Sequence, residues 1–313
     1  MRPFTFLADA REPMSGPKLA DLARRAEATG FHALVIPDHM IPQLSPVAAM
    51  ATIAAATTTL RIGTFVFNND LRHPAVLAQD LASLDVLSEG RLDIGVGAGW
   101  NRKEYDAIGL PFEPVGTRVA RLAESVAVLK GCFGEGPFSF AGEHYTITDF
   151  DAGPRPVQHP HPPFMIGGGG RRVLTLAGRE ASIVGLAPRV LAEYRVDPRS
   201  ITFEATAEKI AWVREAAGNR FESLSFNIYP TAWPVAITDD VHAEAASVIE
   251  YLAGRTGVEM TEAEVLDSPH LFIGSIDMLV EKFQSLRERL GITSITVGGV
   301  DDLTPVVERL AGT

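Results

Sequence analysis

The sequence has one cysteine, Cys132, among its 313 residues. Folds stabilised by disulfides need several cysteines, so that class is excluded, and the thiol content is typical of a reducing compartment. Cys132 falls near the end of a run with helical period, where we expect a buried and inert thiol.

Positive charge and long apolar runs are also scarce. The 28 Lys and Arg residues face 39 Asp and Glu residues, giving a net charge of −11. This balance argues against a nucleic-acid partner, because binding a phosphate backbone needs a basic face. No run reaches the roughly 18 apolar residues that span a bilayer, and no charged and apolar leader segment begins the sequence. We expect a cytoplasmic protein with no membrane partner.

The chain does contain enough apolar material for a large core, since 46% of its residues are hydrophobic. Short runs rich in β-branched and aromatic residues alternate with longer runs in which apolar residues recur at helical spacing, as do Leu19, Leu22, Ala23 and Ala26. The eight predicted strands are 4–8, 32–36, 61–67, 91–96, 163–166, 181–186, 223–228 and 293–297.

Strands that alternate with helices pair in parallel through right-handed crossovers. Eight such units predict an α/β fold, a (β/α)8 TIM barrel with insertion loops, formed by one domain over residues 1–313. An open, doubly wound sheet of the same elements is the alternative. Residues 134–161 are rich in Gly, Pro and aromatic residues. We expect them to form an excursion between the fourth helix and the fifth strand, with a small hairpin around Ala141 and Gly142.

Four glycines and two arginines follow the fifth predicted strand: Gly167, Gly168, Gly169, Gly170, Arg171 and Arg172. The carboxyl ends of the strands carry the active site in a (β/α)8 barrel. Glycines there let the backbone approach a ligand, and the start of the next helix offers free N–H groups. Two arginines in a first helical turn oppose the helix dipole, a conflict that an anionic ligand relieves. The run predicts a phosphate or carboxylate site; a flexible turn with two solvated arginines is the alternative.

The fourth predicted strand ends in Gly95-Val96-Gly97-Ala98-Gly99, followed by Trp100. The run lacks the last spaced glycine of a dinucleotide-binding fingerprint. We interpret Gly97, Ala98 and Gly99 as bare backbone against which a flat ring lies, with Trp100 beside it. A tight turn with a packed Trp explains the pattern nearly as well.

Polar residues also follow the second and third predicted strands. Asp38 and His39 come after the second, and because histidine changes charge near neutral pH we take them as candidate catalytic residues. A satisfied local network is the alternative for this pair. Asn68 follows the third strand and is a candidate cofactor contact. We expect no metal, because no further His or Cys falls at ligand spacing.

Taken in order, several short motifs resemble the bacterial luciferase-like family, in the branch that uses the deazaflavin coenzyme F420. The order and spacing of the motifs carry this resemblance, which covers nearly the whole chain. The motifs are Val35-Ile36-Pro37-Asp38-His39, Leu60-Arg61-Ile62-Gly63-Thr64, Arg72-His73-Pro74-Ala75, Leu84-Asp85, Ser88-Glu89-Gly90-Arg91-Leu92, Gly95-Val96-Gly97-Ala98-Gly99-Trp100, Pro154-Arg155-Pro156-Val157-Gln158, and Pro162-Pro163 before the glycine run.

The resemblance implies a barrel that holds its cofactor at the strand ends. It places the cofactor ring near a bulge in the third strand that carries a non-prolyl cis peptide, here at Phe65 and Val66. It also implies that residues 168–172 anchor the phosphate group. Asp38 and His39 match positions that contact the deazaflavin or the substrate.

The chain differs at two positions from the sugar-phosphate dehydrogenases of the family that it resembles. Those enzymes have a Trp where this chain has Gln43, and a glutamate acid where it has Trp100. Both departures count against sugar-phosphate oxidation, and they leave His39 as the candidate that donates or accepts a proton.

Three functions follow as hypotheses. The first is hydride transfer between coenzyme F420 and a small organic substrate, and the second is an FMN-dependent monooxygenase on the same scaffold. The third is a cofactor-free barrel that acts as a binding protein. We expect a homodimer in each case, since that is the commonest oligomer.

Overall fold

The computed structural model describes residues 2–191 and 195–313. The chain divides into two compact units, each described by itself below. Unit 1 comprises Met1–Ala8, Ala28–His32 and Gly167–Thr313, and unit 2 comprises Asp9–Glu27 and Ala33–Ile166.

The fold is a (β/α)8 barrel, as the sequence predicts. Backbone hydrogen bonds order the strands β3-β2-β1-β13-β10-β9-β8-β5-β4, and β3 also pairs with β5. The order therefore returns on itself, which excludes the open doubly wound sheet. Segments β3 and β4 together correspond to the single strand predicted at 61–67, so the nine segments make eight barrel strands.

The elements of unit 2 alternate as the residue pattern predicts. Unit 2 contains α1 (Gly16–Thr29) up to Glu27. The elements that follow in chain order are β2 (Ala33–Ile36), α2 (Pro46–Ala56), β3 (Arg61–Thr64), β4 (Phe67–Asn68), η1 (Asn69–Leu71), α3 (Pro74–Leu87), β5 (Leu92–Gly97), α4 (Arg102–Ile108), α5 (Val115–Phe133), β6 (Phe138–Ala141), β7 (Thr146–Phe150) and the start of β8 (Phe164–Gly168).

Unit 1 has its own parallel strands and helices. Its elements are β1 (Thr5–Asp9), α6 (Arg171–Glu180), β9 (Ile183–Leu186), η3 (Pro198–Ser200), α7 (Phe203–Ala217), η4 (Gly218–Ser223), β10 (Ser225–Ile228), β11 (Ala236–Ile237), α8 (Val241–Thr256), α9 (Glu262–Asp267), β12 (Ile273–Gly274), α10 (Ile276–Leu290), β13 (Ile292–Thr296) and α11 (Thr304–Leu310). Strand β13 pairs in parallel with β1 and with β10. Helices α8 and α9 contribute Ala245, Val248 and Val265 to an apolar cluster of buried residues.

A bulge interrupts the third barrel strand of unit 2. Gly63 pairs with Asp93 and Phe67 pairs with Val96, so four steps along one strand match three along the other. The extra residue lies where the Phe65-Val66 peptide is cis, which confirms the position predicted for it. Gly95 permits this arrangement, because a methyl group added to it would overlap the carbonyl oxygen of Thr64.

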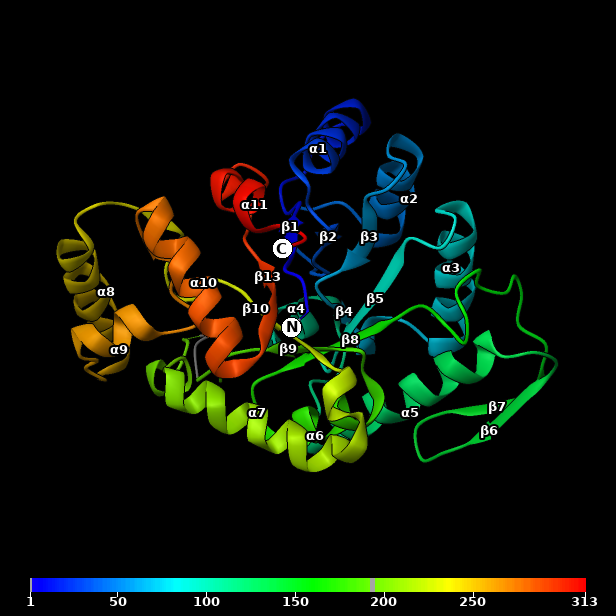
Figure 1. Cartoon of the computed structure of the whole chain (residues 1–313). Coiled ribbons are helices and arrows are strands. Elements are labelled where there is room, and N and C mark those ends of the chain that lie inside the picture. The colour runs from blue at the N-terminus through cyan, green and yellow to red at the C-terminus, as the bar shows by residue number, and fades with distance from the viewer. Residues whose placement is uncertain (1, 192–194) are drawn as a thin grey trace. The chain divides into compact units, whose positions relative to one another are not determined.

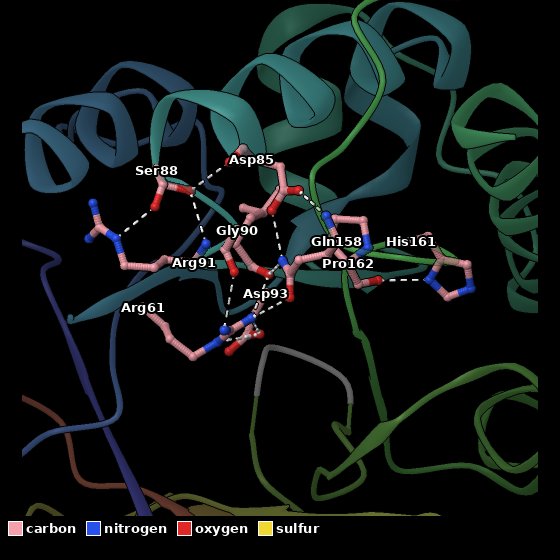
Figure 2. Close-up of polar contacts among 10 residues, drawn as sticks. Arg61, Asp85, Ser88, Gly90, Arg91, Asp93, Gln158, His161 and Pro162 are labelled. Carbon is pink, nitrogen blue, oxygen red and sulfur yellow. Dashed lines mark hydrogen bonds and ion pairs between the residues drawn. The ribbon is translucent and has the colours of Figure 1, made fainter. Parts of the chain in front are cut away.

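The amino-terminal ends of β3 and β5 are tied together by a polar network (Figure 2). Arg61 donates to the Asp93 carboxylate at 2.6 Å and to the side-chain oxygen of Gln158 at 3.0 Å. Gln158 in turn bonds both oxygens of Asp85, through its backbone N at 2.9 Å and its side-chain amide at 2.7 Å. Arg91 donates to the carbonyls of Ala54 and Leu60. Several residues of the motifs that carry the family resemblance therefore stabilise the barrel by linking its strands and helices.

The excursion after α5 contains the small antiparallel hairpin predicted around Ala141 and Gly142, formed by β6 and β7 (Figure 1). Glu124 of α5 accepts hydrogen bonds from the backbone N–H groups of residues 143–145 at 2.8–3.1 Å. Burial raises the pKa of Glu124, but these three donors outweigh it and hold the pKa below its usual value. Within the hairpin turn, the hydroxyl of Tyr145 accepts from the side-chain amide of Asn69 at 3.4 Å, so the hairpin contacts η1.

Across residues 2–191 and 195–313, none of the helices combines the length and the apolar character that crossing a bilayer requires. In the same part of the chain, no three His, Cys, Asp or Glu side chains gather as metal ligands.

Candidate functional site

Asp38, just beyond the end of β2, is held by a bidentate ion pair. Its oxygens accept hydrogen bonds from the two terminal guanidinium nitrogens of Arg72 at 2.6 and 3.1 Å, and from the backbone N of Asn68 at 3.0 Å. The residue is only 4% exposed. The Arg72 guanidinium also lies over the ring of Phe67, 5.2 Å from its centroid. Asp38 thus ties the loop after β2 to the end of β4.

Asn68 connects Asp38 to a second buried group. Its side-chain oxygen accepts from the backbone N of Asp70 at 3.1 Å and from the hydroxyl of Tyr105 at 2.9 Å. The Tyr105 hydroxyl also lies 3.0 Å from one carboxylate oxygen of Asp70. The other oxygen of Asp70 accepts from the Arg121 guanidinium at 2.9 Å. Burial and the neighbouring charge of Asp70 raise the pKa of Tyr105 to about 12. The phenol is therefore a neutral hydrogen-bond donor throughout the physiological range.

The turn after β5 is shaped by the same tyrosine. Gly99 has a φ of +72°, and a methyl group added to it would overlap the Tyr105 hydroxyl. Arg118 donates to the carbonyls of Ala98, at 2.9 Å, and of Gly99, and its guanidinium lies 4.1 Å from the ring centroid of Phe112. Burial lowers the pKa of Arg118. Protein packing by itself therefore requires a glycine at position 99.

His39 is paired with a glutamate that the sequence did not single out. Its Nδ1 lies 2.8 Å from Oε1 of Glu104, and the two side chains are 25% and 6% exposed. The other oxygen of Glu104 accepts from the backbone N of Met40 at 3.2 Å, and Asn101 donates its side-chain amide to Oε1. The ring of Trp100 stands edge-on to His39, with centroids 5.7 Å apart and an interplanar angle of 85°.

Unit 2 thus brings together the predicted residues that follow its strands. Phe65 belongs to the same region, because its backbone N donates to the carbonyl of Ile36 at 3.0 Å. The predicted residues of this unit are Asp38, His39, Phe65, Val66, Asn68, Gly97, Ala98, Gly99 and Trp100. Sequence reasoning did not single out four neighbours that contact these residues, namely Arg72, Glu104, Tyr105 and Arg118. A usable signal for Glu104 was its place in the first turn of the helix directly after a strand-end glycine turn.

The glycine run belongs to unit 1, where Gly168 ends β8 and Gly170 is the N-cap of α6 without a side-chain cap. Added methyl groups would overlap Val173 at position 168 and the Pro188 carbonyl at position 169, so packing explains two of the glycines. A methyl group added to Gly170 would meet no atom within 4 Å, so packing does not explain this glycine.

The two arginines that follow the glycine run are both exposed. Arg171 pairs with Glu215 of α7 at 2.7 Å, which relieves part of the conflict with the helix dipole. The first-turn N–H groups of α6 still lack a side-chain acceptor at the N-cap.

Proteins of known activity match the chain over different lengths. It is 35% identical over 176 residues to an F420-dependent glucose-6-phosphate dehydrogenase of Kineococcus radiotolerans, covering 54% of this chain and 51% of that protein. It is 37% identical over 106 residues to an FMNH2-dependent dimethylsulfone monooxygenase of Pseudomonas putida, covering 34% and 29%. A 5,10-methylenetetrahydromethanopterin reductase of Methanopyrus kandleri is 26% identical over 322 residues, covering 90% and 88%. The chain thus spans about half or less of the length of the first two relatives.

Solved structures confirm the fold. The coenzyme F420 dependent tetrahydromethanopterin reductase of Methanopyrus kandleri superposes with a TM-score of 0.75 at 23% identity, covering 99% of this chain and 98% of that one. An EDTA monooxygenase of Chelativorans sp. BNC1 gives 0.75 at 14% identity, covering 100% and 95%. The model of the luciferase-like monooxygenase family matches residues 3–271. With this match over most of its length, the chain belongs to the luciferase-like monooxygenase family.

Proposed function

We propose that the protein is an oxidoreductase that moves a hydride between coenzyme F420 and a small organic molecule. Three named relatives at 34–35% identity over about half of the chain are F420-dependent, which supports this cofactor. The observation that carries the proposal is the strand-end site of unit 2. There the bulge between β3 and β4, the ion pair of buried Asp38 with Arg72, and a histidine with one ring nitrogen bound to Glu104 lie together.

The residues present fit such a cofactor. At the bulge, Phe65 and Val66 are only half-buried, so part of their surface is exposed where a flat ring could lie. In unit 1, α6 offers uncapped N–H groups and two exposed arginines, a donor set that suits an anionic tail. In unit 2, we propose that Phe65, Val66, Asn68 and residues 97–100 contact the cofactor ring. In unit 1, taken by itself, we propose that residues 167–172 bind an anionic group. When bound, coenzyme F420 supplies hydride-transfer chemistry.

His39 handles the proton in this proposal. Its Nδ1 is engaged by Glu104, and within the described residues no hydrogen bond is made by Nε2. Oxidation of a hydroxyl-bearing substrate transfers a hydride from carbon and releases the hydroxyl proton, which Nε2 accepts. Asp38 acts as a positioning group, because all of its recorded hydrogen bonds are to Arg72 and Asn68.

Two positions favour a substrate other than a sugar phosphate. The side-chain amide of Gln43 donates to the carbonyl of Pro37 at 2.7 Å, so this residue braces the loop before Asp38. Trp100 is exposed and offers His39 the edge of an apolar ring rather than a second acid. We propose an uncharged, partly apolar substrate.

An FMN-dependent monooxygenase is the second candidate, supported by the dimethylsulfone monooxygenase relative. A thermal-shift measurement with F420 and with FMN separates the two. Ligand at 100 times its Kd adds about 2.7 kcal/mol to the free energy of unfolding, which corresponds to a rise of about 4 °C in Tm for a chain of 313 residues. Stabilisation by F420 alone supports the proposal, and stabilisation by FMN alone with oxygen uptake on reduction supports the monooxygenase. Stabilisation by neither supports a cofactor-free binding protein.

A homodimer is part of the proposal. Sedimentation velocity of the purified chain at micromolar concentration tests it, and a species of 33.7 kDa, the mass of one chain, would contradict it.

A further inference from the structure

We infer that Glu104 is a positioning residue that fixes the tautomer of His39, with the proton on Nδ1 and the lone pair on Nε2. The inference rests on the proposed function, in which Nε2 of His39 exchanges the substrate proton. It concerns atoms of this chain alone, so its first test needs neither cofactor nor substrate.

The carboxylate of Glu104 accepts two hydrogen bonds besides its contact with His39. Oε1 lies 2.8 Å from Nδ1 of His39 and also accepts from the side-chain amide of Asn101, while Oε2 accepts from the backbone N of Met40 at 3.2 Å. An ionised carboxylate is acceptor-only, so the imidazole must present an N–H to it. Neutral His39 therefore carries its proton on Nδ1, which leaves Nε2 as the basic nitrogen.

Burial makes this preference strong. A second contact of the same atoms, between Nδ1 of His242 and Oε1 of Glu262 at 2.6 Å, has side chains that are 77% and 49% exposed, against 25% and 6% for His39 and Glu104. A hydrogen bond is electrostatically stronger where water is excluded, whereas an exposed ion pair contributes little. The two pairs are thus a matched comparison within one chain.

The pair serves both directions of the reaction. In oxidation, Nε2 would accept the hydroxyl proton as the substrate carbon gives up a hydride, for which bound coenzyme F420 would be the acceptor. In reduction, the imidazolium would return that proton to the substrate oxygen. Glu104 stabilises the imidazolium in either direction, because its charge lies against the Nδ1–H.

Replacing Glu104 by glutamine reverses the tautomer. The glutamine oxygen satisfies the Met40 N–H only from the Oε2 position, so its NH2 group then faces Nδ1 of His39. Nδ1 must become the acceptor, and the proton moves to Nε2. Asn101 supports this outcome, because its side-chain oxygen is buried without a hydrogen-bond partner among the described residues and can turn to accept from the new amide.

The first test reads the tautomer. Long-range proton–nitrogen correlation spectra of protein labelled with 15N-histidine show which ring nitrogen carries the proton, and H39Q identifies the His39 signals. We expect the proton on Nδ1 in the unchanged chain and in E262Q, and on Nε2 in E104Q. A proton on Nε2 in the unchanged chain, or the same tautomer in E104Q, overturns the inference. Circular dichroism checks that E104Q remains folded.

The second test reads the function. With the alcohol that gives F420 reduction in a spectrophotometric screen, kcat of E104Q should fall about 100-fold or more, with KM within about twofold and with E262Q unchanged. A kcat for E104Q equal to that of E262Q overturns the role of Glu104. Absence of F420 binding by the unchanged chain refutes the proposed function instead, and the tautomer result is independent of it.

Discussion

The ion pair between Asp38 and Arg72 predicts a large and specific loss of stability when Arg72 is replaced by methionine. Methionine keeps an unbranched apolar side chain but removes both hydrogen bonds to a carboxylate that is 4% exposed. Leaving one partner of a buried pair uncompensated costs about 3–5 kcal/mol, and losing the cation–π contact with Phe67 adds about 0.5–1 kcal/mol. The Arg72 side chain is 23% exposed, so water partly compensates. We expect the free energy of unfolding to fall by about 3 kcal/mol.

Urea denaturation followed by circular dichroism measures this loss. Replacing Asp38 by asparagine as well removes the uncompensated charge and keeps an acceptor for the Asn68 N–H. The double variant should therefore be more stable than R72M alone, with a coupling of about 1–3 kcal/mol. The control is R102M, because Arg102 pairs with Asp106 in an exposed i,i+4 contact at 3.4 Å. Its loss should stay below about 0.5 kcal/mol. A loss below about 1 kcal/mol in R72M, or no recovery in the double variant, would refute the reasoning.

Three further changes test other parts of unit 2. G99A should lower Tm, because its φ of +72° costs a β-carbon about 1–2 kcal/mol and the methyl group overlaps Tyr105; an unchanged Tm would contradict this packing. Y105F should lose about 1–3 kcal/mol, because the side-chain oxygen of Asn68 keeps only the Asp70 N–H as a donor and the hydroxyl contact with Asp70 is lost. It should also remove a phenol that ionises near pH 12 in an absorbance titration. Burial raises the pKa of Glu27, but hydrogen bonds from residues 58–60 outweigh it and lower the pKa from 4.5 to about 2. Its stabilisation is therefore complete above pH 4.5 and lost as the pH falls toward 2, so E27Q should flatten the acid-unfolding curve in that window. An identical curve would argue against it.

The sequence alone determined the fold and the strand ends. The alternation of β-branched runs with helical periods located all eight barrel strands, because burial on both faces of a parallel strand leaves a short apolar run that polar loops delimit. The same pattern placed Asp38 and His39 shortly after β2, and it placed Asn68 after its strand, whereas the structure makes Asn68 the last residue of β4; all three lie at the strand ends that carry the active site in this fold. The position of the cis peptide followed from the family resemblance, and the structure has it at Phe65-Val66.

The partners of these residues came only from the tertiary structure. Glu104 lies 65 positions from His39 and Arg72 lies 34 from Asp38, and no local spacing indicates such pairings. The glycine run shows the same limit, because its composition alone does not distinguish a glycine that meets a ligand from one that meets Val173. Local order follows from propensity and hydrophobic period along the chain. Which donor meets which acceptor depends on how the strands align side by side, and that alignment exists only once the chain has folded.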